Sequence, residues 1–408
     1  MTNLEKYIKT IINVGVGLKQ GQKLAISCPV DCAYFAHLAM EEAYKAGAVD
    51  VIIRWNDDKG SRINYLFAPE NSIGVEVEWQ KSLVKHVVEE NYQLLAVSAS
   101  DPEIFNGINP ELIVKHQKMM AKTNKPISDR LSTNVVQWSI AAIPTAAWAK
   151  KVFANAESEA QAIETMWDAI FKASRIDDND PVENWKKHVD TLQKKVQVLM
   201  DYNFKSIHFK NGIGTDLVIE LPKGHVWMAC GEKAATGNVF IANMPTEEVF
   251  TAPLRTGVHG IVYATKPLVY MGNLIEDFWI KFKDGKVIDF AAKKNQDILE
   301  KLITTQENAD YLGEVALVPH SSPISQSGIL WYNTLYDENA SCHLALGRAY
   351  SFTVSGTEGK TEAELIEMGV NQSLTHSDFM MGSADMDIIG TTHDGKQVQV
   401  FKAGEWAI

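Results

Sequence analysis

The spacing of apolar residues changes near residue 203, and this change constrains the fold more than any other feature of the chain. Before it, short apolar runs alternate with longer segments of helical periodicity. This β-α-β order predicts a parallel sheet covered by helices. The expected strands are Lys23–Cys28, Val49–Trp55, Tyr92–Ser98 and Val135–Ile143, and the expected helices are Asn3–Leu18, Ala33–Ala46, Pro110–Lys122, Glu157–Ser174 and Val182–Tyr202.

After residue 203, short alternating runs are separated by turn sequences such as Asn211-Gly212, Asp284-Gly285 and Asp394-Gly395. Such turns between alternating runs are typical of hairpins, so this part is expected to hold a largely antiparallel sheet. We therefore expect two domains, an N-terminal α/β domain at residues 1–195 and an α+β domain at residues 196–408.

Length and charge limit the classes of protein that the chain can belong to. A chain of 408 residues exceeds one ordinary core, and a net charge of −12 argues against a nucleic-acid partner, which needs a basic face. No apolar run is long enough to span a membrane, and the N-terminus lacks the pattern of a signal peptide. Four cysteines in so long a chain do not form a disulfide framework, so we expect a cytoplasmic protein.

Several familiar motifs are absent or incomplete. The segment His86-Val87-Val88-Glu89-Glu90 has its acids in the wrong place for HExxH, which excludes a single-zinc protease of that type. The glycines of residues 15–21 follow a helical stretch rather than a strand, which favours a simple turn over a dinucleotide loop. No GxSxG elbow for serine hydrolysis occurs.

Carboxylates and imidazoles recur in apolar segments of the second half. Such groups are costly in a core unless they are paired or bind a metal, so their convergence would suit two divalent cations. The candidates are Glu248, Glu314, Glu338, His343, His376 and Asp378.

Two of these segments favour a buried or shared position. Glu314 interrupts the apolar run Tyr311–Val318, which reads as a buried strand. His376 and Asp378 are two residues apart, so a strand would point both side chains to the same side.

Two other segments leave alternatives open. Glu247 and Glu248 follow Pro245, and this order equally suits the first turn of a helix. His343 and Tyr350 would share a face of a helix but lie on opposite faces of a strand, and Gly347 weakens either reading.

Four segments, NMPTEEVFTAP, YLGEVALV, LYDENASCHLALGRAY and THSDFMMGS, resemble the signature segments of the metallo-aminopeptidases that include aminopeptidase T, aminopeptidase S and PepS. The resemblance covers the whole chain. It implies an N-terminal α/β domain, a catalytic domain with a two-metal site, and a homodimer. Matched motif by motif, it implies the metal ligands Glu248, Glu314, His343, Tyr350, His376 and Asp378, with Glu338 as a further ligand or a neighbour of the ligands.

The resemblance also implies a mechanism. Carboxylates with imidazoles suit zinc, cobalt, manganese or magnesium, and a hydroxide activated by two such ions would attack the first peptide bond of a substrate with a free N-terminus. Glu247 or Glu338 would serve as general base, and Tyr350 would bind metal or stabilise the oxyanion.

Two rival functions use the same residues. A two-metal phosphoesterase would want basic side chains for phosphate, and the four segments offer Arg348 alone. A non-enzymatic dimeric metal-binding protein is the second rival.

Overall fold

A computed structural model describes residues 1–99, 101, 103–177, 179–270 and 273–408. Its backbone forms two compact units: unit 1 contains Met1–Lys187 and Gly231–Pro245, and unit 2 contains His188–Cys230 and Thr246–Ile408. The expected domain boundary after residue 195 stays a prediction. The two units are discontinuous in sequence because the strand β10 (Asn243–Met244) pairs with the sheet of unit 1.

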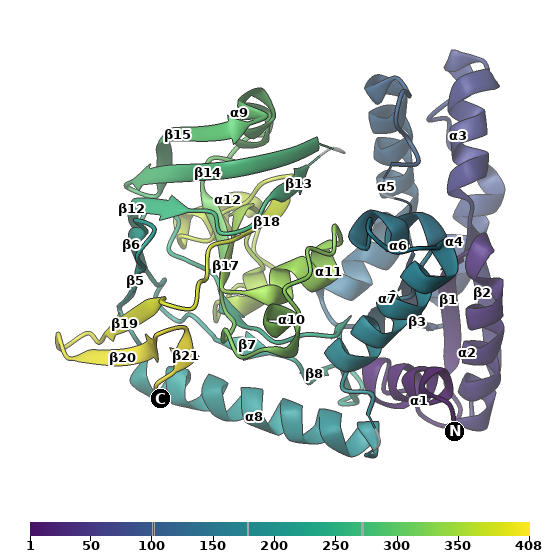
Figure 1. The fold of residues 1–408 in the computed structure, drawn as a ribbon, viewed down its shortest axis with the longest axis horizontal. Helices are drawn as coiled ribbons and strands as arrows, with labels where there is room; N and C mark the ends of the chain where they lie inside the picture. The colour runs from purple at the N-terminus through teal and green to yellow at the C-terminus, as the bar shows by residue number, and fades with distance from the viewer. Residues whose placement is uncertain (100, 102, 178, 271–272) are drawn as a thin grey trace. The chain divides into compact units, whose positions relative to one another are not determined.

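Unit 1 is built on a parallel sheet, as its alternating apolar runs predict. Neighbouring strands follow the order β10-β4-β3-β1-β2, and each pair is parallel. The strands not yet named are β1 (Lys23–Pro29), β2 (Asp50–Asn56), β3 (Gln93–Ser98) and β4 (Trp138–Ala142). In Figure 1 the helix α2 (Ala33–Lys45) runs beside β1 and β2, which it contacts.

The helices of unit 1 include several that the apolar pattern did not predict, namely α3 (Asp58–Phe67), α4 (Glu78–Glu89) and α6 (Ala146–Val152). The helix expected at 110–122 is longer, since α5 spans Pro110–Ser132. Met119, Thr123 and Ile127 are buried at intervals of four residues, so one buried stripe continues along this helix in spite of Pro126. The other helices of unit 1 are α1 (Asn3–Thr10) and α7 (Glu159–Ala173), and α8 (Pro181–Tyr202) begins in unit 1 and continues into unit 2 from His188.

Unit 2 contains an antiparallel sheet of nine strands, which confirms the reading of the Asn-Gly and Asp-Gly turns. Its strands are β5 (Ser206–Lys210), β6 (Asp216–Glu220), β12 (Val258–Tyr263), β13 (Leu268–Tyr270), β14 (Asn273–Lys283), β15 (Lys286–Lys294), β19 (Asp387–Thr391), β20 (Gln397–Lys402) and β21 (Glu405–Trp406).

A second antiparallel sheet of unit 2 contains the candidate ligands. Its strand order is β18-β17-β16-β11-β7. These strands are β7 (Met228–Ala229), β11 (Val249–Thr251), β16 (Leu312–Leu317), β17 (His343–Gly347) and β18 (His376–Met380). Every residue of β16 and β17 is buried, so these two central strands form part of the core of the unit.

The segment that follows Glu248 is the strand β11, so Glu247 and Glu248 do not form the first turn of a helix. Val249 pairs with Leu317 and Thr251 pairs with Val315, so backbone hydrogen bonds to β16 outweigh the local helix-start pattern. The segment around His343 is likewise settled: the short helix α11 (Thr334–Asp337) and one 3₁₀ turn precede the strand β17.

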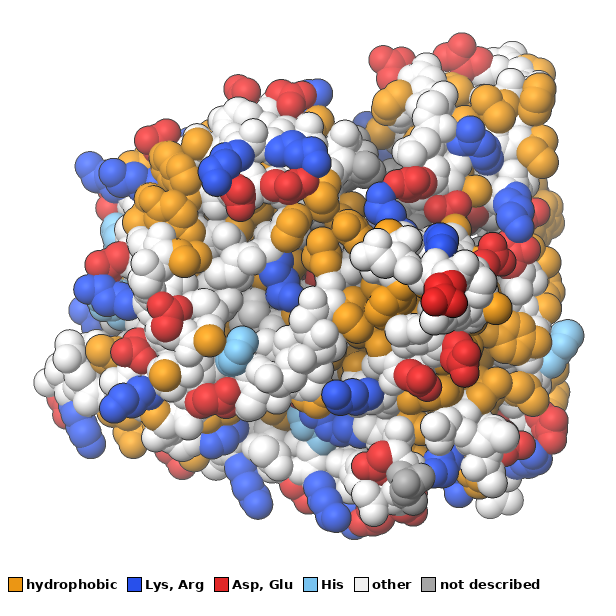
Figure 2. Space-filling model, viewed as in Figure 1, with side chains coloured by type: hydrophobic (Ala, Val, Ile, Leu, Met, Phe, Trp, Pro, Cys, Tyr) orange, Lys and Arg blue, Asp and Glu red, His pale blue; other side chains and the backbone are white. Residues whose placement is uncertain are grey.

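Two observations concern the surface. Among the described residues, no helix combines the length and apolar character that crossing a membrane requires. Figure 2 shows Lys and Arg side chains interspersed with Asp and Glu on the visible face, so that face has no continuous basic surface.

Candidate metal centre

Five of the candidate ligands lie on one face of the five-stranded sheet of unit 2. Glu314 pairs with Ala345 of β17, and Ala345 pairs with Asp378 of β18. His376 is two residues before Asp378 on the same strand. Side chains paired across strands, or two apart along one strand, share a face. His343 is two residues from Ala345 on β17, so its side chain lies on the same face. Glu248 comes directly before Val249, whose side chain points to the opposite face, so the side chain of Glu248 also lies on the face of the ligands.

Small residues occupy the sheet positions between these ligands. Ala345 is the alanine that pairs with both Glu314 and Asp378, Ala316 pairs with His343, and Gly347 pairs with His376. A Cβ atom on Gly347 would lie 2.1 Å from the carbonyl oxygen of Thr375, and its φ of 104° also favours glycine. Because these side chains are small, they leave space above the centre of this face, and the ligand side chains surround that space.

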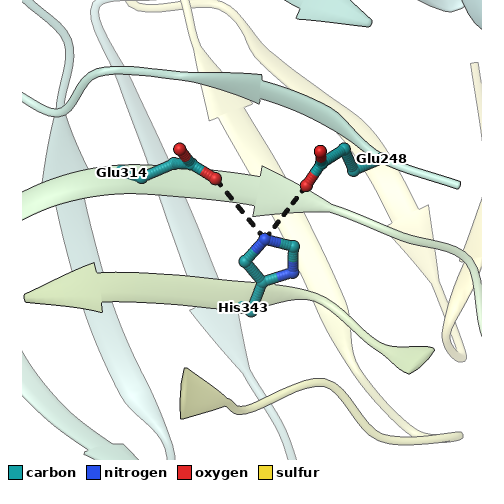
Figure 3. Close-up of side chains that lie close together, drawn as sticks. All are labelled: Glu248, Glu314 and His343. Atoms are coloured by element: carbon teal, nitrogen blue, oxygen red, sulfur yellow. Dashed lines mark ion pairs between the residues drawn. The ribbon is translucent and has the colours of Figure 1, made fainter. Parts of the chain in front are cut away.

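Glu314 lies at the middle of the cluster. Its Oε1 is 3.4 Å from His343 Nε2, and its Oε2 is 3.7 Å from His376 Nε2. Glu248 Oε2 is 3.1 Å from His343 Nε2, and Asp378 Oδ1 is 3.3 Å from His376 Nε2. Figure 3 draws the ion pairs of His343 with Glu248 and Glu314. One carboxylate therefore joins two groups of three ligands, Glu248–Glu314–His343 and Glu314–His376–Asp378.

Both imidazoles are oriented by backbone carbonyls. His343 Nδ1 lies 3.1 Å from the carbonyl oxygen of Ser341, and His376 Nδ1 lies 2.7 Å from that of Arg348. Because a carbonyl only accepts, each Nδ1 carries the proton and donates. This arrangement turns each Nε2 toward the carboxylates, which is the usual orientation of metal-binding histidines.

The cluster concentrates charge in a place with little water. Burial raises the pKa of Glu314, an effect that the hydrogen bond to His343 only partly offsets. Burial disfavours a charged His343, yet hydrogen bonds to Glu248 and Glu314 raise its pKa well above the usual value. Burial likewise opposes charge on His376, but Asp378 raises its pKa to about 10. Without metal, protonated imidazoles would balance the charge of the carboxylates, and bound divalent cations would supply the same balance.

The donor set fits divalent metal ions. Each group offers two carboxylates and one imidazole, and the ligand atoms within a group all lie within 4.8 Å of one another. Oxygen and imidazole ligands suit zinc, cobalt, manganese and magnesium.

Glu338 borders the cluster rather than sitting within it. It lines a pocket of about 90 Å³ together with Asp378, Leu268, Val269 and Met380. Burial raises the pKa of Glu338 well above its usual value, and the nearby carboxylates of Asp378 and Glu248 add to this rise. The pocket thus has an acidic end at the cluster and walls that combine apolar side chains with the polar residues Asn333 and Thr334.

Glu247 is directed elsewhere. Its backbone N–H donates to Asn339 Oδ1 at 2.8 Å, and its Oε2 lies 3.8 Å from His188 Nε2. It belongs to neither group of ligands that the structure brings together.

Tyr350 lies at the edge of the cluster. Its ring centroid is 5.0 Å from that of His376 and 5.3 Å from that of Phe352, against which it stacks. Burial and the carboxylates of Glu314 and Asp378 raise the pKa of Tyr350, so its phenol keeps the proton and can donate it in a hydrogen bond.

Four residues of this site were not predicted from the sequence, namely Ala316, Ala345 and the pocket residues Leu268 and Met380. Met380 offered a signal, since it is two residues after Asp378 and continues the same face of β18. Leu268 offered none, because its approach to Met380 depends on contacts between β13 and β18.

Comparison with known proteins gives consistent relatives. The model of a family described as thermophilic metalloprotease (M29) matches residues 1–406. Aminopeptidase PepS of Streptococcus thermophilus is 44% identical over 406 residues, which are 100% of this chain and 98% of that protein. Aminopeptidase AmpS of Bacillus subtilis is 41% identical over 404 residues, with 99% and 98% covered. The structure of wild-type AmpT from Thermus thermophilus matches with a TM-score of 0.93 and 35% identity, over 100% of this chain and 99% of that one.

Proposed function

This chain belongs to the M29 family of thermophilic metalloproteases, and on that premise we propose that it is an aminopeptidase that uses two divalent ions bound around Glu314. As a member of the family it is a hydrolase of peptide bonds. The relatives named aminopeptidase PepS and aminopeptidase AmpS, which match nearly the whole chain, support release of N-terminal residues.

The position of Glu314 carries the proposal of two ions. Its two oxygens face two different imidazoles, and each imidazole has a second carboxylate beside it, Glu248 for His343 and Asp378 for His376. A carboxylate placed in this way can bridge two ions. We assign Glu248, Glu314 and His343 to one ion and Glu314, His376 and Asp378 to the other, with Zn²⁺, Co²⁺, Mn²⁺ or Mg²⁺ as candidates.

Bound divalent ions would polarise the substrate carbonyl and supply a water of lowered pKa at neutral pH. The side chains around them would do the rest. Glu338 borders the cluster and has a raised pKa, which suits a general base that takes a proton from water and passes it to the leaving amine. Tyr350, protonated and beside His376, would donate a hydrogen bond to the carbonyl oxygen as negative charge develops on it.

The pocket beside the cluster would select the substrate. The acidic end of this pocket would favour a substrate with a free, charged α-ammonium group, and Leu268, Val269 and Met380 would contact an apolar first side chain. A blocked amine would lose the charged contact, so cleavage would be restricted to N-terminal residues.

A phosphoesterase would use the same ion ligands but would need basic side chains at the substrate. Arg348 is the basic residue of the four segments, and in the structure its side chain is exposed while its carbonyl group orients His376. The donor set is thus more suited to a neutral carbonyl than to a phosphate.

The test compares substrates on protein that has been stripped with a chelator and then given back each metal ion. We expect metal-dependent hydrolysis of leucine p-nitroanilide, little hydrolysis of its N-acetyl derivative, and none of p-nitrophenyl phosphate. Equal hydrolysis of free and acetylated substrates would contradict the aminopeptidase assignment. Hydrolysis of the phosphate alone would favour the phosphoesterase.

We also propose a homodimer, on the resemblance of the four signature segments. Sedimentation of the purified protein should give twice the chain mass of 45.4 kDa, and a species of single mass would refute the dimer.

A further inference from the structure

A larger cavity, of about 510 Å³, lies in unit 1 at the carboxyl ends of its parallel strands. Segments that follow β1, β2, β3 and β4 all contribute to its lining, and α7 adds Ile163. A volume of this size suits a small organic ligand.

The strand order places this cavity where α/β sheets bind ligands. From β1 the chain moves to β2 on one side and then crosses to β3 on the other side of β1. The winding therefore reverses between β1 and β3, and the crevice outside the carboxyl ends at such a reversal is the general binding position in open parallel sheets.

The polar side chains of the lining favour a cation. Four aspartates line the cavity, namely Asp31, Asp57, Asp58 and Asp101. Lys59 also lines it, and its ammonium group pairs with Asp31 at 2.8 Å. Asp57 caps α3 through Oδ1, which accepts from the N–H of Gly60 at 2.8 Å, and Asp101 accepts from the N–H of Glu103 at 2.9 Å. Each of these bonds occupies one oxygen, and a carboxylate has two.

Asp58 is the least satisfied of the four. It is half-buried, and its side chain makes no hydrogen bond or ion pair within the part of the chain that the structure describes. Burial raises the pKa of Asp58, and the carboxylates of Asp57 and Asp101 raise it further. A bound cation would relieve this repulsion.

Apart from Asn56 and Thr145, the remaining residues of the lining are mostly apolar. Val30, Tyr34, Ile104, Pro144 and Ile163 contribute side chains with little to offer a hydrated metal ion. A ligand that satisfies both parts has a positive head and an apolar body.

We propose that this cavity binds an organic primary ammonium ion that carries an apolar side chain. This is the chemistry of a peptide amino terminus. Its identification with a peptide rests on the proposed function, whereas the binding of an ammonium ion does not.

The test uses isothermal titration of the full-length, metal-loaded protein with three probes of one carbon skeleton: isopentylamine, isopentanol and isovalerate. The amine should bind and the alcohol and the acid should not. The same titration of Glu314→Gln, which removes the proposed bridging ligand, should still show amine binding even where hydrolysis is lost. Failure of the proposed function and failure of this inference are thereby distinguishable.

Two variants place the binding in the cavity. Asp58→Asn removes one charge and should weaken amine binding about tenfold, while Ala147→Phe, at an exposed position of the lining, should abolish it by filling the space. Asp168→Asn, which removes an exposed charge of α7 outside the lining, is the matched control and should bind as the unchanged protein does.

A further measurement needs no variant: the methyl resonances of Ile104 and Ile163 should shift as isopentylamine is added. Equal binding of amine and alcohol, unchanged binding by Asp58→Asn, or loss of binding in Glu314→Gln alone would overturn the proposal. Binding of Mg²⁺ without binding of the amine would also overturn it.

Discussion

Glu314 is shared between His343 and His376: its Oε1 lies 3.4 Å from the Nε2 of the first and its Oε2 lies 3.7 Å from the Nε2 of the second. The two histidines come from different strands, β17 and β18, and each has its own second carboxylate. This relationship divides the cluster into two halves with one common ligand, and several predictions depend on it.

Replacing one histidine should empty one half of the site. His343→Ala and His376→Ala should each lower the bound metal by about one ion per chain and lower kcat strongly, because both ions act on one substrate. Metal content by mass spectrometry and hydrolysis rates of the same samples give the result. His393→Ala changes an exposed histidine and should keep both ions. Full metal content in either cluster variant would show that the histidine is no ligand.

Enlarging Ala345 should block the site while leaving every ligand in place. This alanine pairs with both Glu314 and Asp378, so a leucine there would project between them. We expect Ala345→Leu to lose metal binding and activity, and to lower the free energy of unfolding by about 1–3 kcal/mol through overpacking. Ala363→Leu, on the exposed surface of α12 (Glu362–Glu367), is the control. An active, metal-loaded Ala345→Leu would mean that the ions do not lie over this alanine.

Metal binding should strengthen as pH rises. Without metal, the pKa of His376 is about 10 and that of His343 is well above its usual value, so both imidazoles are protonated at pH 7. A metal must displace these protons, and calorimetry at pH 7 in buffers of different ionisation enthalpy should detect their release. Affinity that is independent of pH between 6 and 8 would argue against this competition.

The stability of metal-free protein should change in the opposite direction. Because the pKa of His376 in the folded state is above the unfolded value near 6.5, its stabilising contribution is complete below pH 6.5 and is lost as pH rises toward 10. Thermal unfolding of chelator-treated protein should show a falling Tm over this range. Restored metal should reduce the fall, because the imidazoles are then neutral in the folded state throughout.

The two acids considered as general base should behave differently. Glu338 borders the cluster, while Glu247 lies against His188 and Asn339. Glu338→Gln should lower kcat by about 10²- to 10⁴-fold with both metals retained. Glu247→Gln is the matched control, because it is the same substitution in the acid directly before Glu248 in the sequence, and it should have a much smaller effect on kcat. A larger loss in Glu247→Gln would reverse the assignment, and metal loss in Glu338→Gln would make Glu338 a ligand instead.

Part of this site was predictable because it depends on local patterns. An apolar run around Glu314 predicted the buried strand β16, and the spacing of His376 and Asp378 predicted that they share a face. Both inferences need only the alternation of a strand, which neighbouring residues determine.

The rest depends on contacts that are distant in sequence. Pro245-Thr246-Glu247-Glu248 satisfies a helix start, and pairing with β16, more than 60 residues later, makes the segment after it a strand. Glu247 and Glu248 both precede β11, and the contacts that distinguish them, Glu247 with His188 and Glu248 with His343, are also distant in sequence. The helices α3 and α6 are short and bury few side chains, Tyr65 in α3 and Trp148 and Ala149 in α6, so little of an apolar pattern marks them in the sequence. The parallel sheet of unit 1 was found from its continuous apolar strands.

The decisive measurement for the two-metal proposal is the number of ions bound around Glu314. Chelator-treated protein is titrated with Zn²⁺ or Co²⁺, and the bound metal and the hydrolysis of leucine p-nitroanilide are measured at each step. The proteins compared are the unchanged protein, Glu314→Gln and the exposed control Glu367→Gln. We predict that activity in the unchanged protein and in the control reaches its maximum at two ions per chain, and that Glu314→Gln binds fewer and is inactive. Maximal activity at one ion per chain, or an active Glu314→Gln with full metal content, would contradict the two-metal proposal.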